Sequence, residues 1–201
     1  MNYLQPNTYG LDAIITQLQT MWYGKALLIW NPENEYNLFG RSNRNKAVGQ
    51  GYYPEVYYNG GNTTPEGTQN NGGMFFSDSV SGFSFFDEIS TKYHQGRDVR
   101  SVIRMVTSLR LDQITPAGIA NAYPQSRLDD IAMWDLVNWF NVTKASNFNV
   151  ISNEKSIDKV YDRYSGPFKQ DALTKNVGNR FSFSVDFELI WNPLLYQNIK
   201  N

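Results

Sequence analysis

The strongest constraint in this chain is a strict alternation of residue type near one end. Between residues 181 and 191 every odd position is apolar, while the even positions up to 188 are polar. A period of two over such a length predicts an antiparallel β-strand with one buried face. The apolar positions are Phe181, Phe183, Val185, Phe187, Leu189 and Trp191, and the polar ones are Ser182, Ser184, Asp186 and Glu188.

Two helices are predicted by apolar residues spaced three and four apart. The first begins at Asn7 or Thr8 and ends at Gly24, and the segment 25–30 that follows has the composition of a short buried strand. The second begins after Ser126 and is apolar around most of its circumference, which predicts burial on two sides. A third, short helix is predicted to begin at Asn153 or Ser156.

Further strands are expected along the chain. Residues 101–114 alternate in polarity, and the segments 52–58 and 148–152 have the composition of strands. Residues 74–76 and 83–86 flank a Ser/Gly turn and are predicted to form a hairpin. Because helices and strands are partly segregated, we expect one α+β domain over 1–201, with a mostly antiparallel twisted sheet packed by two main helices.

Two polar segments, at about 31–51 and 59–73, are predicted to be long extended loop arms, and residues 192–201 to be a short tail. Long segments without regular structure inside one domain are usually functional or disordered. The arms are therefore where we expect contacts with partners.

Composition excludes several classes of chemistry. The chain has no Cys and one His, which removes disulfides, thiol nucleophiles and Cys-ligated metals, so we expect no cofactor and no metal site. The carboxylate pairs Asp87/Glu88 and Asp129/Asp130 could act as catalytic or metal-binding groups, but the second pair also suits a first helical turn. No signal peptide or membrane-spanning run is expected, so synthesis in a cytosol is predicted.

Two groups of residues are candidates for contacts. Arg41, Arg44 and Lys46 lie close together without an acidic neighbour in sequence, which is typical either of a solvated loop or of a contact with DNA phosphates or an acidic partner. Aromatic residues make up 15% of the chain, so some of them are expected at subunit contacts rather than in the core. The contact candidates are Tyr52, Tyr53, Tyr57, Tyr58, Phe75, Phe76, Phe85 and Phe86.

The order of elements resembles that of phage tail-terminator and head-to-tail neck proteins. The resemblance rests on the first helix leading into residues 26–30, the polar arm, the strand 100–109 and the closing strand 181–191. The segment Lys159-Val-Tyr-Asp-Arg-Tyr-Ser-Gly166 and the Asn- and Tyr-rich composition are most similar to those of ring proteins of crAss-like phages.

This resemblance implies a structural virion protein, not an enzyme. It implies a homo-oligomeric ring of six or twelve copies in the neck, contacts with portal, neck and tail proteins, and DNA passing non-specifically through the lumen. Such a protein is assembled in the host cytoplasm and has no membrane partner, cofactor or catalytic residue.

Two other interpretations remain open at this point. A carbohydrate-binding or adhesin-like virion protein would use Trp22, Trp30 and the tyrosine clusters to stack on sugars. A small hydrolase would use His94 as a general base, oriented by Asp98.

Overall fold

The computed structural model describes residues 1–4, 9–47, 51–58, 61–63, 79–93, 98–116, 128–142, 148–164 and 180–193. The side chains of residues 44–47, 51 and 61–63 are outside that description. The helices are α1 (Gly10–Trp30), α2 (Leu128–Val142) and α3 (Ile157–Val160). The strands are β1 (Asn2–Tyr3), β2 (Glu35–Ala47), β3 (Gly51–Tyr58), β4 (Gly61–Thr63), β5 (Val80–Tyr93), β6 (Val99–Arg110), β7 (Phe148–Glu154) and β8 (Arg180–Trp191).

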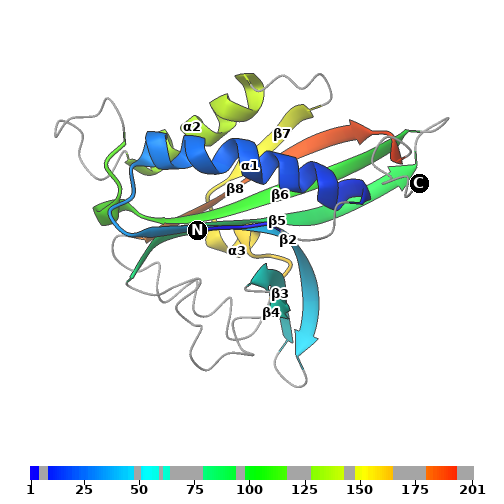
Figure 1. The fold of residues 1–201 in the computed structure, drawn as a ribbon, viewed down its shortest axis with the longest axis horizontal. Coiled ribbons are helices and arrows are strands. Elements are labelled where there is room, and N and C mark those ends of the chain that lie inside the picture. Colours follow the sequence, from blue (N-terminus) through cyan, green and yellow to red (C-terminus); the bar gives the residue numbers. More distant parts are fainter. Residues whose placement is uncertain are drawn as a thin grey trace.

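The predicted α+β class is confirmed, and the sheet is mixed. Its strands follow the order β4-β3-β2-β5-β6-β8-β7, with β1 beside β2. The pairings β1–β2 and β2–β5 are parallel, and the remaining ones are antiparallel. Figure 1 shows α1 and α2 over one face of the sheet, with α3, β3 and β4 on the other side.

The predicted end of the first helix at Gly24, and the short strand after it, are wrong. Helix α1 continues without a break to Trp30. Trp22, Ala26 and Trp30 are all buried and lie four residues apart, so the apolar stripe runs through Gly24. The helix ends at Asn31, which takes the left-handed conformation at φ 42° and donates its backbone N–H to the carbonyl of Leu27 at 3.1 Å.

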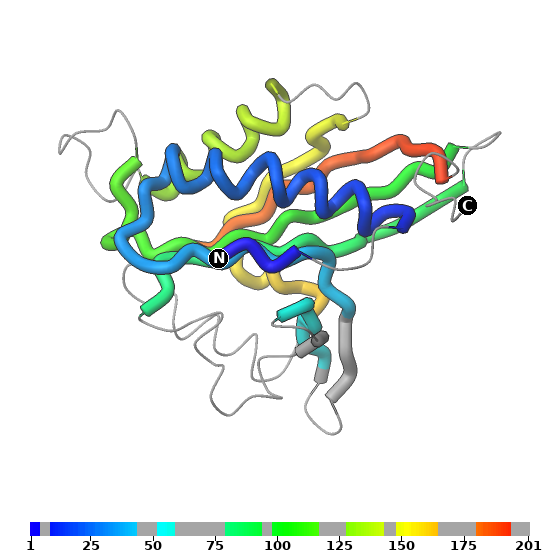
Figure 2. Tube along the Cα trace, viewed as in Figure 1, coloured from blue at the N-terminus to red at the C-terminus, as the bar shows by residue number. Residues whose placement is uncertain are grey.

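The prediction of a loop arm over 31–51 is also wrong, because most of this segment is strand β2. Its first part is paired on β5, from Glu35 opposite Val80 to Ser42 opposite Asp87, and its last part is paired with β3 instead. Tyr36, Leu38 and their neighbours Asn37 and Phe39 are buried on both faces, so no alternation marks the strand in the sequence. Figure 2 shows the chain leaving the sheet at the end of β2 and returning through β3. We call β3, β4 and residues 43–47 of β2 the arm. Of the second predicted arm, 59–73, the strand β4 is described and the rest lies outside the described residues.

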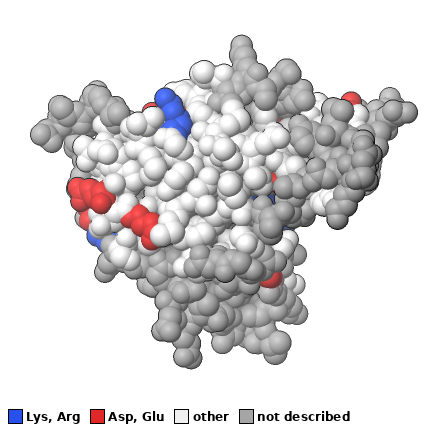
Figure 3. All heavy atoms as spheres, viewed as in Figure 1, with Lys and Arg blue, Asp and Glu red and all other residues white. Residues whose placement is uncertain are grey.

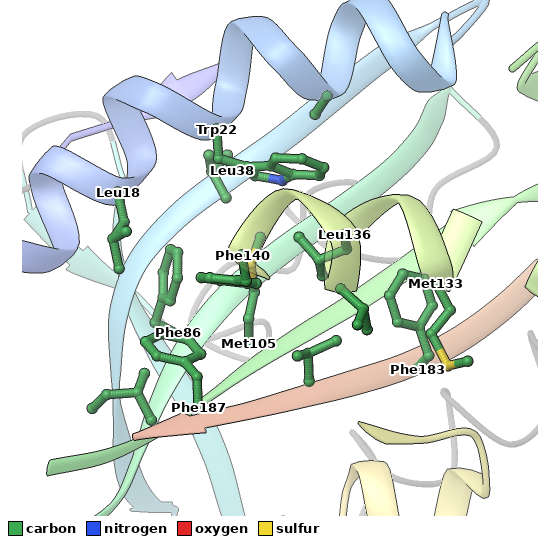
Figure 4. Packing of buried hydrophobic residues seen from close by; sticks show 14 of the residues in the cluster. Leu18, Trp22, Leu38, Phe86, Met105, Met133, Leu136, Phe140, Phe183 and Phe187 are labelled. Carbon is green, nitrogen blue, oxygen red and sulfur yellow. The ribbon is translucent and has the colours of Figure 1, made fainter. Parts of the chain in front are cut away.

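The strand predicted from the alternation is confirmed as β8, but the prediction of a single buried face is wrong, because both faces are covered. The odd positions from Phe183 to Leu189 join the main core between the sheet and the two long helices. Figure 4 shows this core, in which Leu18 and Trp22 of α1 and Leu136 and Phe140 of α2 point toward Phe86, Met105 and Phe187 of the sheet. On the opposite face, Ser182 and Ser184 are buried rather than exposed to solvent.

A second core covers that opposite face. It joins residues of the arm and of the segment around α3 to the sheet, namely Phe39, Tyr53, Val56, Phe83, Phe85, Val106, Val160, Tyr161 and Tyr164. The base of the arm is therefore packed on the sheet and does not project freely. The predicted strands over 52–58, 101–114 and 148–152 correspond to β3, β6 and β7. The predicted end of the second of these at Ile114 is wrong, because β6 stops at Arg110 and Leu111–Gln113 form a 3-10 helix. Residues 83–86 lie in β5, and residues 74–76 of the predicted hairpin are outside the described residues.

Candidate functional site

Arg41 is partly exposed and is paired with two carboxylates of its own chain, although no acidic residue lies near it in the sequence. It lies on β2 where the strand turns away from β5, and its side chain sits between two carboxylates. Its Nε donates to Oδ1 of Asp12 at 2.6 Å, and its Nη1 donates to Oε2 of Glu88 at 2.5 Å. Burial alone would lower the pKa of Arg41, but the two carboxylates outweigh burial and leave that pKa raised. Arg41 therefore ties α1 to β2 and β5.

The contacts of Glu88 extend this tie across the sheet. Thr91 donates to Glu88 at 2.5 Å and is bonded to Ser101 at 2.8 Å. The indole of Trp191 donates to the same Ser101 hydroxyl at 3.0 Å. Four elements, β2, β5, β6 and β8, are thus linked by one polar chain beneath the start of α1.

Arg44 and Lys46 lie on the arm part of β2, and their side chains are outside the described residues. They stay candidates for a contact with DNA phosphates or with an acidic partner.

The aromatic contact candidates divide into buried and partly exposed residues. Phe85 and Phe86 are fully buried in the two cores, and Tyr53 is buried in the second, so these three cannot meet another subunit in this conformation. Tyr52, Tyr57 and Tyr58 are partly exposed. Phe75 and Phe76 lie outside the described residues.

The carboxylate pairs are engaged by basic residues. Asp87 and Glu88 point to opposite faces of the sheet, where Asp87 pairs with Arg163 at 3.3 Å and Glu88 with Arg41. Asp129 and Asp130 both pair with Lys155. Within the described ranges, no group of three or more His, Asp or Glu residues could hold a metal ion.

A further charge cluster attaches the segment around α3 to the sheet. Asp87, Arg104 and Asp186 are in register across β5, β6 and β8. Arg104 bonds Asp186 at 2.8 Å and Asp162 at 2.9 Å. Burial would lower the pKa of Arg104, but the surrounding aspartates outweigh it and leave that pKa raised. Each of these charges has a partner of opposite sign, so the cluster attaches the segment around α3 to the sheet.

The alternatives based on sugar stacking and on His94 receive no support from the described residues. Trp22 and Trp30 are buried beneath α1, so the prediction that they stack on sugars is wrong. Asp98 is exposed, and His94 lies outside the described residues. Among the described helices, none is long and apolar enough to cross a membrane.

Sequence reasoning missed the outward surface of α1 and α2. On α1, Met21 and Leu28 are 51% and 72% exposed, and on α2 Trp134 is 50% exposed. The 21 residues of α1 include two charged ones, Asp12 and Lys25, and Asp12 is already paired with Arg41. Figure 3 shows that the visible surface over α1 is largely uncharged. The scarcity of charge in residues 10–30 is the signal that could have found it.

No protein-family model matches this chain, and no curated protein matches it either.

Proposed function

We propose that this chain is a structural virion protein whose copies close into a ring in the head-to-tail neck of a tailed phage, around the DNA channel. The proposal rests on the resemblance of the chain's element order, and of its segment 159–166, to those of neck ring proteins. A twisted sheet with mostly antiparallel pairings, packed by two main helices, is the tail-terminator-like arrangement that this resemblance implies. The ring is homo-oligomeric, of six or twelve copies, and borders portal, neck or tail proteins.

The observation that carries the proposal is the arm. Strand β2 belongs to the main sheet up to Ser42, and from Asn43 to Ala47 it pairs with β3 instead. Beyond its packed base, this ribbon of β2, β3 and β4 provides an extended surface for a neighbouring copy. In a ring, such a contact is heterologous, because the arm of one copy meets a different surface of the next. Arg44 and Lys46 on this ribbon are the residues we assign to contact with DNA in the lumen.

The test combines a mass measurement with a substitution in the arm. Tyr57 of β3 is partly exposed, and Tyr57→Glu places a charge on the ribbon surface. Tyr93→Glu is the matched control, because Tyr93 is an 88% exposed tyrosine at the end of β5. We expect native mass spectrometry and electron microscopy to show rings for the parent chain and for Tyr93→Glu, and smaller species for Tyr57→Glu.

Two results would contradict the proposal. A parent chain that forms no ring in solution, and is absent from the necks of purified particles, removes the ring function. If the Tyr57→Glu variant forms rings with the same number of copies as the parent, the arm is not the contact between copies, although the chain still forms a ring. Replacing Arg44 and Lys46 by Ser should reduce genome retention in particles without changing the ring mass.

A further inference from the structure

The arm is built as a unit that pairs with itself. Residues 43–47 of β2 pair with β3, and β3 pairs with β4, whereas β2 pairs with β5 only up to Ser42. Among the described strands, β3 and β4 are paired with β2 and with each other alone. The arm can therefore leave the face of the sheet without breaking a ladder of backbone hydrogen bonds.

The part of β2 that is fixed to the sheet ends immediately before the arm. Arg41 holds β2 to α1 and β5 through its two ion pairs, and the Ser42 hydroxyl lies 2.9 Å from that of Tyr164. The next residue, Asn43, is the first to pair with β3. The pairing of β2 with β5 is irregular around Gly40, and such an irregularity bends a strand. A hinge between Ser42 and Asn43 would thus move the arm while the rest of the chain is held.

Side chains hold the arm on its own sheet. Tyr53 and Val56 of β3 are buried in the second core, and the ring of Tyr58 lies 4.9 Å from that of Tyr3 of β1. The surface of the second core therefore fits this side of the arm. Every copy of the chain carries the same surface, so the arm of one copy fits the second core of another equally well.

The return connection is long enough for such an exchange. Residues 64–78 separate the end of β4 from Ser79, and fifteen extended residues span up to about 50 Å. The equivalent surface on an adjacent copy is about one domain diameter away, which is roughly 40 Å for a domain of this length. The connection thus does not confine the arm to its own copy.

We propose that the arm is exchanged in the ring, so that Tyr53 and Val56 of each copy enter the second core of the next copy, in the place that the next copy's own arm has left. This inference rests on the proposed ring and names the surface that the arm meets there. Exchange makes between copies the contacts that the free chain makes within itself, so these contacts alone favour neither form. The ring is then favoured by additional contacts between neighbours, which include the exposed side of the arm with Tyr57.

Cross-linking between two kinds of copy tests the exchange directly, because the chain has no cysteine of its own. Copies carrying Tyr3→Cys and copies carrying Tyr58→Cys are mixed one to one, assembled and treated with a short bismaleimide. An arm seated on its own copy leaves each thiol without a partner thiol, whereas exchange brings the two thiols together. We expect up to about half of the chains in rings to become covalent dimers, and at least tenfold fewer in the unassembled mixture. Tyr93→Cys in place of Tyr3→Cys is the matched control and should give only the unassembled level.

The same two positions allow the arm to be locked before assembly. In the double variant Tyr3→Cys/Tyr58→Cys, cross-linking of dilute monomers joins the arm to its own copy. Locked chains should form at least tenfold fewer rings than the untreated double variant, and cleaving a cleavable cross-linker should restore the rings. The single variant Tyr58→Cys, treated with the same reagent, controls for modification of the thiol.

Val56→Ala gives a readout that docking without exchange would not produce. Val56 is 1% exposed, so its truncation weakens the hold on the arm. Because the arm must be released before it is exchanged, rings should form at least threefold faster. The yield of rings at equilibrium should stay within twofold, since the same contact is lost within and between copies. Val142→Ala, at a 79% exposed valine in α2, is the matched control and should change neither quantity.

The outcomes separate the exchange from the ring. Locked chains that assemble as well as unlocked ones, rings without covalent dimers, or slower assembly of Val56→Ala would each overturn the exchange and leave the ring function standing. Covalent dimers in assemblies that are not rings would support the exchange and overturn the ring. A parent chain that stays monomeric at all accessible concentrations would overturn both.

Discussion

Replacing Arg41 by Met tests the pairing of this residue with Asp12 and Glu88. The substitution keeps an unbranched apolar stem and removes the guanidinium group, which leaves Asp12 and Glu88 without their cation. The side chain of Asp12 is 10% exposed and that of Glu88 is 29% exposed, so both lose a partner in a partly desolvated site. Removing one partner of a fully buried ion pair costs about 3–5 kcal/mol. Because Arg41 is itself 27% exposed, we expect about 2–3 kcal/mol.

Urea unfolding followed by tryptophan fluorescence measures this loss, and Tm should fall by about 5–10 °C. Arg100→Met is the matched control, because Arg100 is 44% exposed and meets Glu188 at 3.4 Å, so its loss should cost at most about 1 kcal/mol. Adding Asp12→Asn and Glu88→Gln to Arg41→Met should recover at least half of the lost stability. If the Arg41 and Arg100 variants lose the same free energy of unfolding, the ion pairs of Arg41 do not stabilise the fold more than an exposed pair does, and Arg41 behaves as a surface cation.

Three further predictions concern single positions. Gly82→Ala should destabilise the fold by about 1–3 kcal/mol in urea unfolding, because its Cβ would lie 2.5 Å from Leu109 and 2.8 Å from a backbone oxygen of β6; an unchanged midpoint would contradict that packing. Asp135→Asn should be more stable than the parent at pH 7 by about 1 kcal/mol, discounted for partial exposure. The folded pKa of Asp135 is raised to about 6, so the parent loses stability as pH rises from about 4 to 6, and the gain of the variant should vanish below that window in a pH series of Tm values. Tyr164→Phe removes the hydroxyl bonded to Ser42 at 2.9 Å and should cost about 1 kcal/mol by chemical denaturation, whereas a cost near zero would show that water replaces it.

Local pattern predicted a strand where the two faces of the strand differ in residue type, whether or not the polar face is exposed. The alternation that ends at Trp191 corresponds to β8, because its apolar face meets the long helices. The end of α1 could not be predicted, since Gly24 has the composition of a helix stop while the backbone continues to Asn31. Tertiary packing of Trp30 under the helix overrides the low helix propensity of glycine there.

The site depended on contacts that no local pattern carries. The partners of Arg41 lie 29 and 47 residues away in sequence, so its surroundings looked free of acids. Phe85 and Phe86 looked like surplus aromatics, yet the sheet has a core on each face and buries one in each. One core needs fewer aromatics than two, and the number of cores is a property of the topology.

The parallel pairing of β2 with β5 has a consequence for how freely the arm can change. The chain leaves this pairing at Ser42 and re-enters it at Val80, opposite Glu35, so it must travel back along seven residues of strand, roughly 23 Å. About eight extended residues bridge that distance. The connection consists of residues 43–79, which is many more residues than are needed to span that distance. The arm is thus an insertion that the sheet can accommodate in many lengths. We expect chains of this architecture to vary in the arm while the pairing of residues 35–42 with 80–87 is retained.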